Sequence, residues 1–368
     1  MVKIFLEHLT KTFKEKGKEV IAVKDLNLEI SHKSIVGILG PSGCGKTTTL
    51  RMIAGLTKPS SGRILFDDKD VTSLPPRERN VALMFQFPVV YDTMTVFENL
   101  SLPLRVHDVK KEEINKKVRD IAEFLGLTNI LYKKAKGLSA AINQKIALGR
   151  ALIRDPDVLL LDEPLSSLDP ETRLYFRREL KEVIKSMEST VVYVTHDQSE
   201  AMTLCDKIAV MNEGSLIQYD TPENIYSIPA DKFVGWFIGE PGMNFIDVSL
   251  KLSDNKILLL LDEYIKFDVS KWSDNLKGSE EIILGIRPEL IEISREKGLN
   301  SLPAKCVAKE IFSSYALLGF EAKNLIIKVK TTSIESLPEE DEVMYLNFPP
   351  ENVRLYDKKS GKLLVVMR

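Results

Sequence analysis

The stretch that decides the fold is Gly40-Pro-Ser-Gly-Cys-Gly-Lys-Thr47. It follows an apolar run, Ser34 to Leu39, that predicts a β-strand, and it leads into a helical pattern from Lys46 to Ala54. Glycines let successive backbone N–H groups converge on an anion, and a helix N-terminus adds a positive dipole. Every fixed position of the pattern G-x-x-x-x-G-K-[ST] is filled in this strand–loop–helix setting, so the stretch predicts a phosphate-binding loop.

The loop further predicts a site for a nucleoside triphosphate. The Lys46 ammonium can reach the β- and γ-phosphates, and the Thr47 hydroxyl can bind Mg²⁺. The alternative, a Gly/Ser-rich turn that caps a helix, accounts for one or two of these residues and leaves the others unexplained.

Composition bounds the class of protein. A chain of 368 residues exceeds the usual limit of a single core, so two or more domains are expected. With 51 Lys and Arg against 53 Asp and Glu, the charge gives no case for nucleic acid or an anionic membrane as the main partner. The 3 cysteines are unclustered, which indicates neither a disulfide framework nor a zinc site and favours a reducing compartment. The start has no long apolar signal region and no stretch approaches about 20 apolar residues, so a membrane role would come through a partner.

Periodicity predicts an α/β core that contains the loop. Two continuous apolar runs, Val158 to Asp162 and Thr190 to Thr195, are separated by a helical pattern from Pro170 to Met187, which is typical of parallel strands buried on both faces. Further strands are expected at Ile4 to Ile30, around a polar loop at 14–19, and at Gly62 to Phe66 and Asn80 to Phe85. Thr95 to about Arg154 has helical spacing, including a helix from Lys110 to Gly126 with the glycine as C-cap.

A second domain is expected after the composition shift at Gly239 to Gly242. Beyond it, helical patterns give way to short strands and turns. We therefore predict domains at 1–238, with a helical subdomain at about 88–155, and at 239–368, the latter all-β. Its expected elements are strands at Lys256 to Leu261, Tyr264 to Val269, Glu281 to Ile286, Ala304 to Ile311 and Val343 to Phe348, a turn at Asp262-Glu263 and a solvated acidic turn at Glu339 to Glu342.

Two carboxylates follow the first buried run, in Asp162-Glu163-Pro164. They would emerge at the C-terminal edge of the sheet, where open α/β folds bind ligands. Asp162 is a candidate partner of Mg²⁺ through water, and Glu163 is a candidate base for the attacking water. The alternative for the pair is a solvated Asp-Glu turn before proline.

With these motifs in order, the chain resembles the ATP-binding subunit of an ABC importer over almost its whole length. The resemblance makes 40–47 the Walker A, 158–163 the Walker B, Ser166 to Asp169 the D-loop, Gln86 the Q-loop glutamine and His196 the switch histidine. It implies ATP and Mg²⁺ as cofactors, with Mg²⁺ held by Thr47, Gln86 and Asp162. It implies that Glu163, His196 and Gln86 are catalytic and that ATP is bound by Phe13, Gly40, Pro41, Ser42, Gly43, Cys44, Gly45, Lys46, Thr47, Thr48, Ser139 and Asp169.

Three of these assignments depend on the resemblance. Phe13 matches the aromatic that stacks on adenine, whereas an N-terminal Phe alone would more often be core. His196 alone would be a structural residue at a strand end, and the family role is to contact the γ-phosphate or orient the attacking water. Gln86 alone would be a polar loop residue; in the family it senses the γ-phosphate, and the segment after it, here Phe87 to Phe97, meets the membrane-embedded partner.

The chain departs from the family where the latter has Leu-Ser-Gly-Gly-Gln. This sequence has Leu138-Ser-Ala-Ala-Ile-Asn-Gln-Lys145. Ser139 can still cap the following helix. Alanine would cost about 1–2 kcal/mol where glycine needs positive φ, and would gain about 1 kcal/mol inside a helix. The resemblance implies a head-to-tail dimer in which this segment covers the partner's ATP, so the departure puts that contact in question. In a homodimer, both ATP sites would have the altered segment. In a heterodimer, this chain would pair with a paralogue that could supply an ordinary signature.

The resemblance also narrows the type of importer. The signature variant and the run after Gln86 are similar to a glycerol or polyol branch. Motifs at Phe233 to Phe245, Leu284 to Glu289 and Phe348 to Tyr356 look like the linker and small OB-like β-barrels of carbohydrate-uptake ATPases of the maltose-importer type. In that family the barrels mediate dimer contacts and can bind regulators.

The expected function is therefore an ATPase that energises uptake of a sugar, glycerol or related polyol. It would lie at the cytoplasmic face of the cell membrane on transmembrane permease subunits, with an extracytoplasmic solute-binding protein in the wider system. Alternatives are an importer ATPase for another solute and a regulatory module that binds ATP with little turnover, favoured by Ala140, Ala141 and Ile142 and opposed by Glu163 and His196. A non-transport ABC ATPase for DNA repair or translation would predict two cassettes, a long coiled coil or a basic surface, none of which the sequence has.

Overall fold

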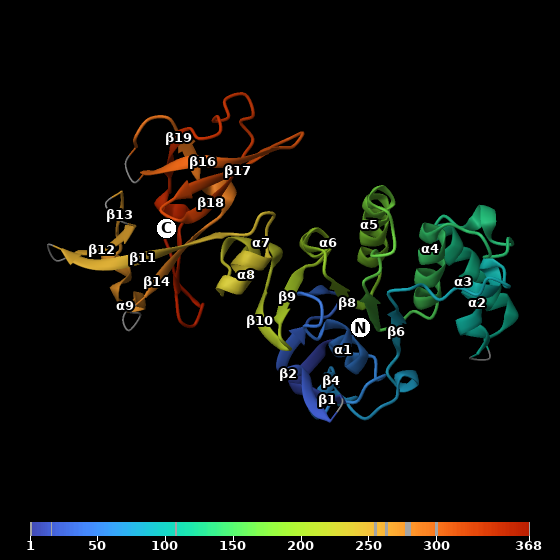
Figure 1. Ribbon diagram of the computed structural model, residues 1–368. Coiled ribbons are helices and arrows are strands. Elements are labelled where there is room, and N and C mark those ends of the chain that lie inside the picture. Colours follow the sequence, from blue (N-terminus) through green and yellow to red (C-terminus); the bar gives the residue numbers. More distant parts are fainter. Residues whose placement is uncertain are drawn as a thin grey trace. The chain divides into compact units, whose positions relative to one another are not determined.

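The structure is a computed structural model that describes residues 2–15, 17–106, 109–253, 256–261, 264–276, 281–298 and 301–367 (Figure 1). Internal contacts divide the chain into two compact units, residues 1–222 and 223–368, and each is described by itself. The domain boundary expected from composition, at 238–239, stays a prediction. The turn expected at Asp262-Glu263 lies outside the described residues.

The first unit is built on a six-stranded sheet with the order β10-β9-β3-β8-β7-β6. Strands β6, β7, β8, β3 and β9 run parallel, and β10 pairs antiparallel with β9. All residues of β3, β7 and β8 are buried, which confirms the predicted parallel strands with two covered faces. The bounds are β3 Ile35–Leu39, β6 Val81–Met84, β7 Val158–Asp162, β8 Thr190–Thr195, β9 Lys207–Asn212 and β10 Ser215–Asp220.

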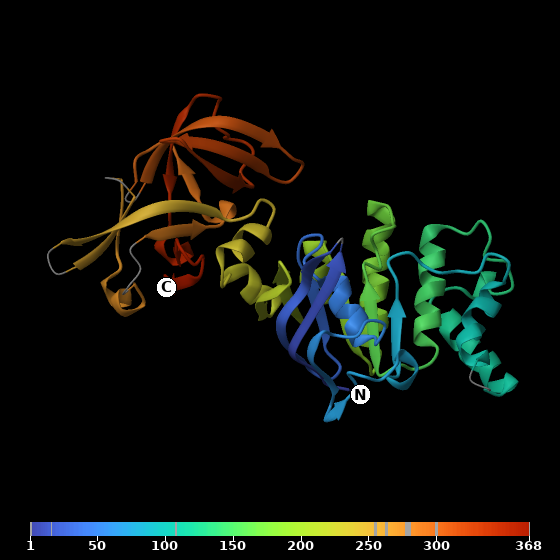
Figure 2. The same ribbon diagram turned by 60° about the horizontal axis from the view of Figure 1, so that its bottom comes forward.

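A second, antiparallel sheet in this unit has the order β2-β1-β4-β5. Its strands are β1 Ile4–Glu15, β2 Lys18–Ile30, β4 Ser61–Phe66 and β5 Lys69–Asp70. Figure 2 shows the long strands β1 and β2 beside α1 (Lys46–Ile53). One apolar cluster joins residues of this sheet, of α1 and of the central strands, so the helix that follows the phosphate loop is fixed by a common core.

Three helices between β6 and β7 confirm the predicted helical region: α2 Val96–Arg105, α3 Lys111–Phe124 and α4 Ala140–Leu152 (Figure 1). α2 begins with a reciprocal cap in which the Thr95 Oγ1 accepts from the Glu98 N–H at 3.1 Å and Glu98 accepts from the Thr95 N–H at 2.8 Å. α3 buries Ile114, Val118 and Ala122. Gly126, after its end, has φ +67, as its expected role as a C-cap requires. The later helices are α5 Pro170–Lys185 and α6 Gln198–Leu204.

The second unit is mainly antiparallel β-structure, as predicted. Its sheets have the orders β13-β12-β11-β14-β20-β21 and β15-β19-β16-β17-β18. One correction is needed, because the sequence showed no helix beyond Gly242 and the structure has α9 at Ser273–Leu276, a single turn too short to produce a periodic pattern. The bounds are α7 Pro222–Ser227, α8 Lys232–Phe237, β11 Asn244–Ser253, β12 Lys256–Leu261, β13 Ile265–Asp268, β14 Ile282–Ile286, β15 Glu292–Ser294, β16 Ser301–Ile311, β17 Ala316–Ala322, β18 Leu325–Thr331, β19 Val343–Asn347, β20 Arg354–Asp357 and β21 Leu363–Val366.

The C-terminal motifs are structural in this unit. Arg287 is only 2% exposed, and its guanidinium donates to the carbonyl oxygens of Gly235, Ile238 and, at 2.8 Å, Tyr226. The Tyr356 hydroxyl donates to the Pro229 carbonyl at 3.1 Å. These four bonds tie the sheet of β14 and β20 to the segment of α7 and α8.

Candidate functional site

The loop between β3 and α1 needs glycine at its two ends for steric reasons. Gly45 has φ +103, and a Cβ there would lie 2.3 Å from the Ala22 carbonyl oxygen. A Cβ on Gly40 would lie 2.2 Å from the carbonyl oxygen of Met211 in β9. Gly43 has φ +79, so the loop turns its backbone in a way that favours glycine.

Lys46, the first residue of α1, points its ammonium back into the loop. It is 6% exposed, and its Nζ donates to the carbonyl oxygens of Gly40 at 2.7 Å and Pro41 at 2.8 Å. The third donor of the ammonium lies 3.8 Å from the Cys44 Sγ, a weak acceptor that an anion held by the loop can replace. Burial raises the pKa of the neighbouring Cys44 thiol, which therefore remains protonated beside Lys46 at neutral pH.

Thr47 and Asp162 meet at the end of β7. The Thr47 hydroxyl donates to the Asp162 Oδ1 at 3.0 Å, and Asp162 is 6% exposed. Burial raises the pKa of this carboxyl, the charge of Glu163 raises it further, and the bond from Thr47 opposes both effects. A hydroxyl and a carboxylate side by side fit Mg²⁺, which takes oxygen ligands and usually uses one or two carboxylates with substrate phosphates.

Gln86, Glu163 and His196 come together from three different segments. The Glu163 Oε2 lies 3.1 Å from the Gln86 Nε2 and 3.1 Å from the His196 Nδ1, and no bond to Oε1 is found among the described residues. Glu163 has φ +46, a left-handed conformation that costs a non-glycine residue about 1–2 kcal/mol. Its N–H donates to the Val194 carbonyl at 2.9 Å, so the sheet holds this strained residue in place.

These groups surround one pocket of about 520 Å³. Ala22 on β2 lines it and was not expected from the sequence, because an alanine side chain carries no chemical signal. Seven expected site residues are not among its lining residues. Gly40, Pro41 and Cys44 belong to the loop itself and Asp162 contacts Thr47, whereas Phe13, Ser139 and Asp169 have no such place beside the pocket. That lining consists of Ala22, Ser42, Gly43, Gly45, Lys46, Thr47, Thr48, Gln86, Glu163 and His196.

Phe13, Ser139 and Asp169 lie on other elements. Phe13 on β1 is 38% exposed, with the Lys11 ammonium 5.0 Å from its ring centre. Ser139 caps α4, where its Oγ accepts from the Ile142 N–H at 3.4 Å. Asp169 caps α5, and the N–H of Thr172 lowers the pKa of its carboxyl. Ser139 is exposed at the start of α4, accessible to a partner.

The altered signature forms an ordinary helix start. Ala140 and Ala141 begin α4, and neither is among the described residues with positive φ. The strain considered for alanine at these positions is therefore absent. The buried Gln144 amide donates to the Pro164 carbonyl and, at 3.3 Å, to the Ser167 Oγ, which connects α4 to the segment after β7.

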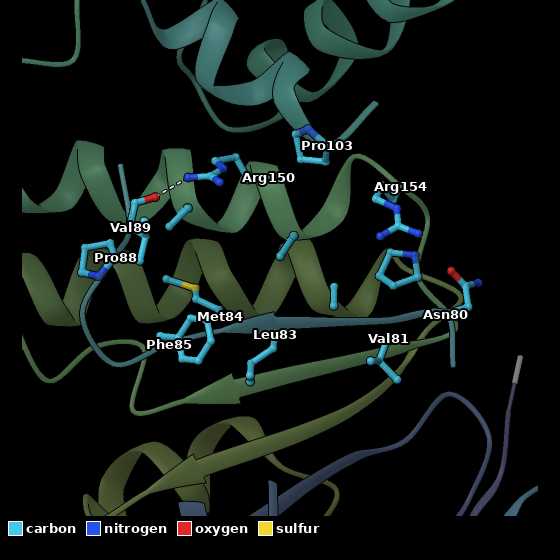
Figure 3. Close-up of a pocket in the computed structure, with 14 residues that line it drawn as sticks. Asn80, Val81, Leu83, Met84, Phe85, Pro88, Val89, Pro103, Arg150 and Arg154 are labelled. Atoms are coloured by element: carbon cyan, nitrogen blue, oxygen red, sulfur yellow. Dashed lines mark hydrogen bonds between the residues drawn. The ribbon is translucent and has the colours of Figure 1, made fainter. Parts of the chain in front are cut away.

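The segment after Gln86 lies beside a second pocket of about 330 Å³ between β6 and α4 (Figure 3). Arg150 on α4 donates to the Val89 carbonyl, and its guanidinium lies 5.0 Å from the Tyr91 ring centre. Phe87 and Val89 are 72% and 54% exposed. The segment thus presents apolar side chains to solvent while α4 holds its backbone. Among the described residues, no helix combines the length and the apolar character needed to cross a membrane.

Comparisons place the chain in a family. Residues 23–166 match the family model described as ABC transporter. The chain is 39% identical to the trehalose/maltose import ATP-binding protein MalK of Thermococcus litoralis, over 94% of this chain and 96% of that protein. It is 40% identical to the osmoprotective compounds uptake ATP-binding protein GgtA of Synechocystis, over 90% and 88% respectively. The chain belongs to the family of ABC transporter ATP-binding proteins, which are ATPases.

A solved structure supports the same conclusion over 60% of this chain. The ATP-binding cassette MJ0796, a dimer in a post-hydrolysis state bound to ADP and phosphate, is 30% identical and superposes with a TM-score of 0.54 over 60% of this chain and 98% of that chain. The predicted ABC ATPase fold is confirmed.

Proposed function

We propose that this chain binds ATP with Mg²⁺ and hydrolyses it to drive import of a sugar, a polyol or a related osmolyte. The observation that carries the chemistry is the Glu163 carboxylate, which contacts both Gln86 and His196 in the pocket that also contains Lys46 and Thr47. The solute class rests on the relatives, which import trehalose and maltose or take up osmoprotective compounds.

The loop and its flanking side chains divide the work of binding. The N–H groups of residues 42–48 and the Lys46 ammonium hold the phosphates of ATP, with the α1 dipole in support. Thr47, Asp162 and the amide oxygen of Gln86 would hold Mg²⁺, which would supply positive charge to the phosphates of ATP. The ring of Phe13 on β1 would stack on the adenine of the bound ATP.

Glu163 acts as the base in this proposal. Its Oε2 is held by Gln86 and His196, which leaves Oε1 to accept a proton from the attacking water. Gln86 and His196 orient that carboxylate and contact the γ-phosphate. The strained backbone of Glu163 supports this role, because such conformations cluster at functional sites.

Assembly completes the proposal. Two ATPase chains, identical or paralogous, would place the Ser139 and Asp169 of one copy over the ATP of the other. Permease subunits would contact the exposed segment Phe87 to Phe97, which would put the chain at the cytoplasmic face of the membrane, with an extracytoplasmic solute-binding protein beyond it. No nucleic acid is proposed as a partner. The C-terminal unit would serve dimerisation or regulation.

The decisive experiment compares Glu163→Gln with Lys46→Ala in the full chain co-purified with its membrane partners. Glu163→Gln should keep ATP affinity and lower hydrolysis by roughly 10²–10⁴-fold. Lys46→Ala should weaken nucleotide binding itself. Exposed Glu171→Gln is the matched control and should leave both unchanged. Hydrolysis by Glu163→Gln within about twofold of the parent would remove the base role, and unchanged ATP affinity of Lys46→Ala would refute the phosphate loop.

A further inference from the structure

Two segments that carry site residues begin adjacent helices. Asp169 caps α5 at the end of the segment after Glu163. His196 precedes Asp197, which caps α6 and whose Oδ1 accepts from the Glu200 N–H at 3.1 Å. A displacement of either cap therefore moves the neighbouring site residue.

Arg173 on α5 connects these segments. Its Nη2 donates to the Leu168 carbonyl oxygen at 3.0 Å, directly before Asp169. Its Nη1 lies 3.7 Å from the Asp197 Oδ2, directly after His196. Its Nε is buried and has no partner among the described residues. The guanidinium is thus hydrogen-bonded to the segment that ends at Asp169, whereas its contact with Asp197 is too long for a hydrogen bond.

The turn at His196 is held together by a cluster of buried side chains. The Asp197 N–H donates to the Thr195 Oγ1 at 2.9 Å, and that hydroxyl donates to the Glu200 Oε2 at 2.8 Å. The Tyr193 hydroxyl donates to the same Oε2 at 2.8 Å, and Glu200 is 3% exposed. Because these bonds form one network, the turn with His196 can move as a unit.

We propose that Arg173 is a positioning residue that couples the Asp169 segment to His196 within one subunit. The 3.7 Å separation from Asp197 exceeds the length of a charge-assisted hydrogen bond, about 2.7–2.9 Å. A shift of the order of 1 Å in the Leu168 carbonyl would complete that bond and draw the His196 turn with it. Engagement of Asp169 by a partner subunit would then set the position of His196 against the γ-phosphate. The inference rests on the proposed function.

The groups that face this contact favour a charge link. The carboxylate of Asp197 at the start of α6 faces Arg173, which is the cation within ion-pair distance of that cap among the described residues. Arg173→Met keeps an apolar side chain of similar length and removes the guanidinium group. Arg173→Lys keeps the charge but has a single ammonium, which cannot bond both segments with planar geometry.

The first test measures steady-state ATP hydrolysis by the full chain with its co-purified membrane partners. We expect Arg173→Met to lower kcat by about tenfold with KM for ATP within about twofold, since the link acts after binding. Arg173→Lys should fall between the parent and Arg173→Met. Arg178→Met, an exposed arginine of the same helix, is the control and should match the parent.

A double-mutant cycle separates coupling from packing. Asp197→Asn retains a good helix cap and loses the charge that faces Arg173. It should lower kcat like Arg173→Met, and the double variant should be no slower than either single variant. Multiplied losses in the double variant, or an unchanged kcat in Arg173→Met, would overturn the inference.

Hydrogen exchange gives a second readout that a merely structural role would not move. With a non-hydrolysable ATP analogue, the parent should gain protection in residues 40–50 and in 196–204, whereas Arg173→Met should gain it only in 40–50. Equal protection of both segments in Arg173→Met refutes the coupling and leaves the proposed function intact. No protection of residues 40–50 in the parent refutes the proposed function, and the coupling with it.

Discussion

Restoring the family signature should lower stability and raise turnover at the same time. The variant is Ala140→Gly, Ala141→Gly and Ile142→Gln. Both alanines start α4 with helical backbone, so each glycine loses up to about 1 kcal/mol of helix propensity. Because residues of the first helical turn are less constrained than those in the interior, we expect the unfolding free energy to fall by about 1–2 kcal/mol in total. This corresponds to a fall in Tm of about 2–8 °C for a unit of this size.

Turnover should rise because the restored segment can approach the partner's ATP more closely and offers an amide. We expect little change in ATP affinity, since the segment acts in closure and at the transition state. The assay is ATPase rate and nucleotide-driven dimerisation of the purified chain, together with thermal unfolding. Lys116→Gly, exposed on α3, is the control; it should lower Tm without any gain in turnover.

Two outcomes would refute this reasoning. Brisk turnover by the parent homodimer with no gain from the triple variant would show that the departure is functionally silent. An unchanged or higher Tm of the triple variant would contradict the helical state of Ala140 and Ala141.

Three further outcomes follow from buried groups. Asp162→Asn should be more stable than the parent at pH 7 by chemical denaturation without nucleotide, because the raised pKa of Asp162 makes its charged form unfavourable in the folded state; the difference should shrink as pH falls through the folded-state pKa and vanish below the unfolded-chain pKa of about 3.9, where the carboxyl is protonated in both states. Arg79→Met should cost about 3–5 kcal/mol in unfolding free energy, since the Arg79 guanidinium donates to the carbonyls of Met52, Ile53, Leu74 and Thr72, including the end of α1, and is 4% exposed; a loss below about 1 kcal/mol would contradict this. Alkylation of Cys44 in the native protein should be slow at pH 8 by mass spectrometry, because the thiol is 3% exposed with a raised pKa; rapid labelling would show that the loop opens.

The central strands and the phosphate loop could be predicted because their signals are local. The run Val158 to Leu161 is apolar throughout, which is typical of a strand covered on both faces, and the loop pattern fixes its residues by backbone geometry. Grouping Gln86, Glu163 and His196 needed the resemblance, since nothing in their sequence separation brings them together. In the structure, the Gln86 and His196 side chains both contact the Oε2 of Glu163.

Features that depend on tertiary contact were not predictable. Ala22 reaches the pocket because β2 passes close to Gly45, and its side chain gives no sign of this. Arg79 belongs to no motif in the sequence, yet its guanidinium donates to the carbonyl oxygens at the end of α1 from a distant turn. The roles of Phe13, Ser139 and Asp169 stay predictions, because a single chain does not bring them to the pocket.

The strand order of the first unit has a consequence for biosynthesis. β3, which leads into the phosphate loop, pairs with β8 and β9, and β8 begins at Thr190, roughly 150 residues after β3 ends. At a synthesis rate of about 5–20 residues per second, an apolar strand waits roughly 8–30 s on the ribosome for its neighbours. During that interval the nascent chain exposes an unpaired apolar strand edge that can associate with other chains. The first half of this protein should therefore depend on chaperones bound near the exit tunnel until β8 and β9 emerge.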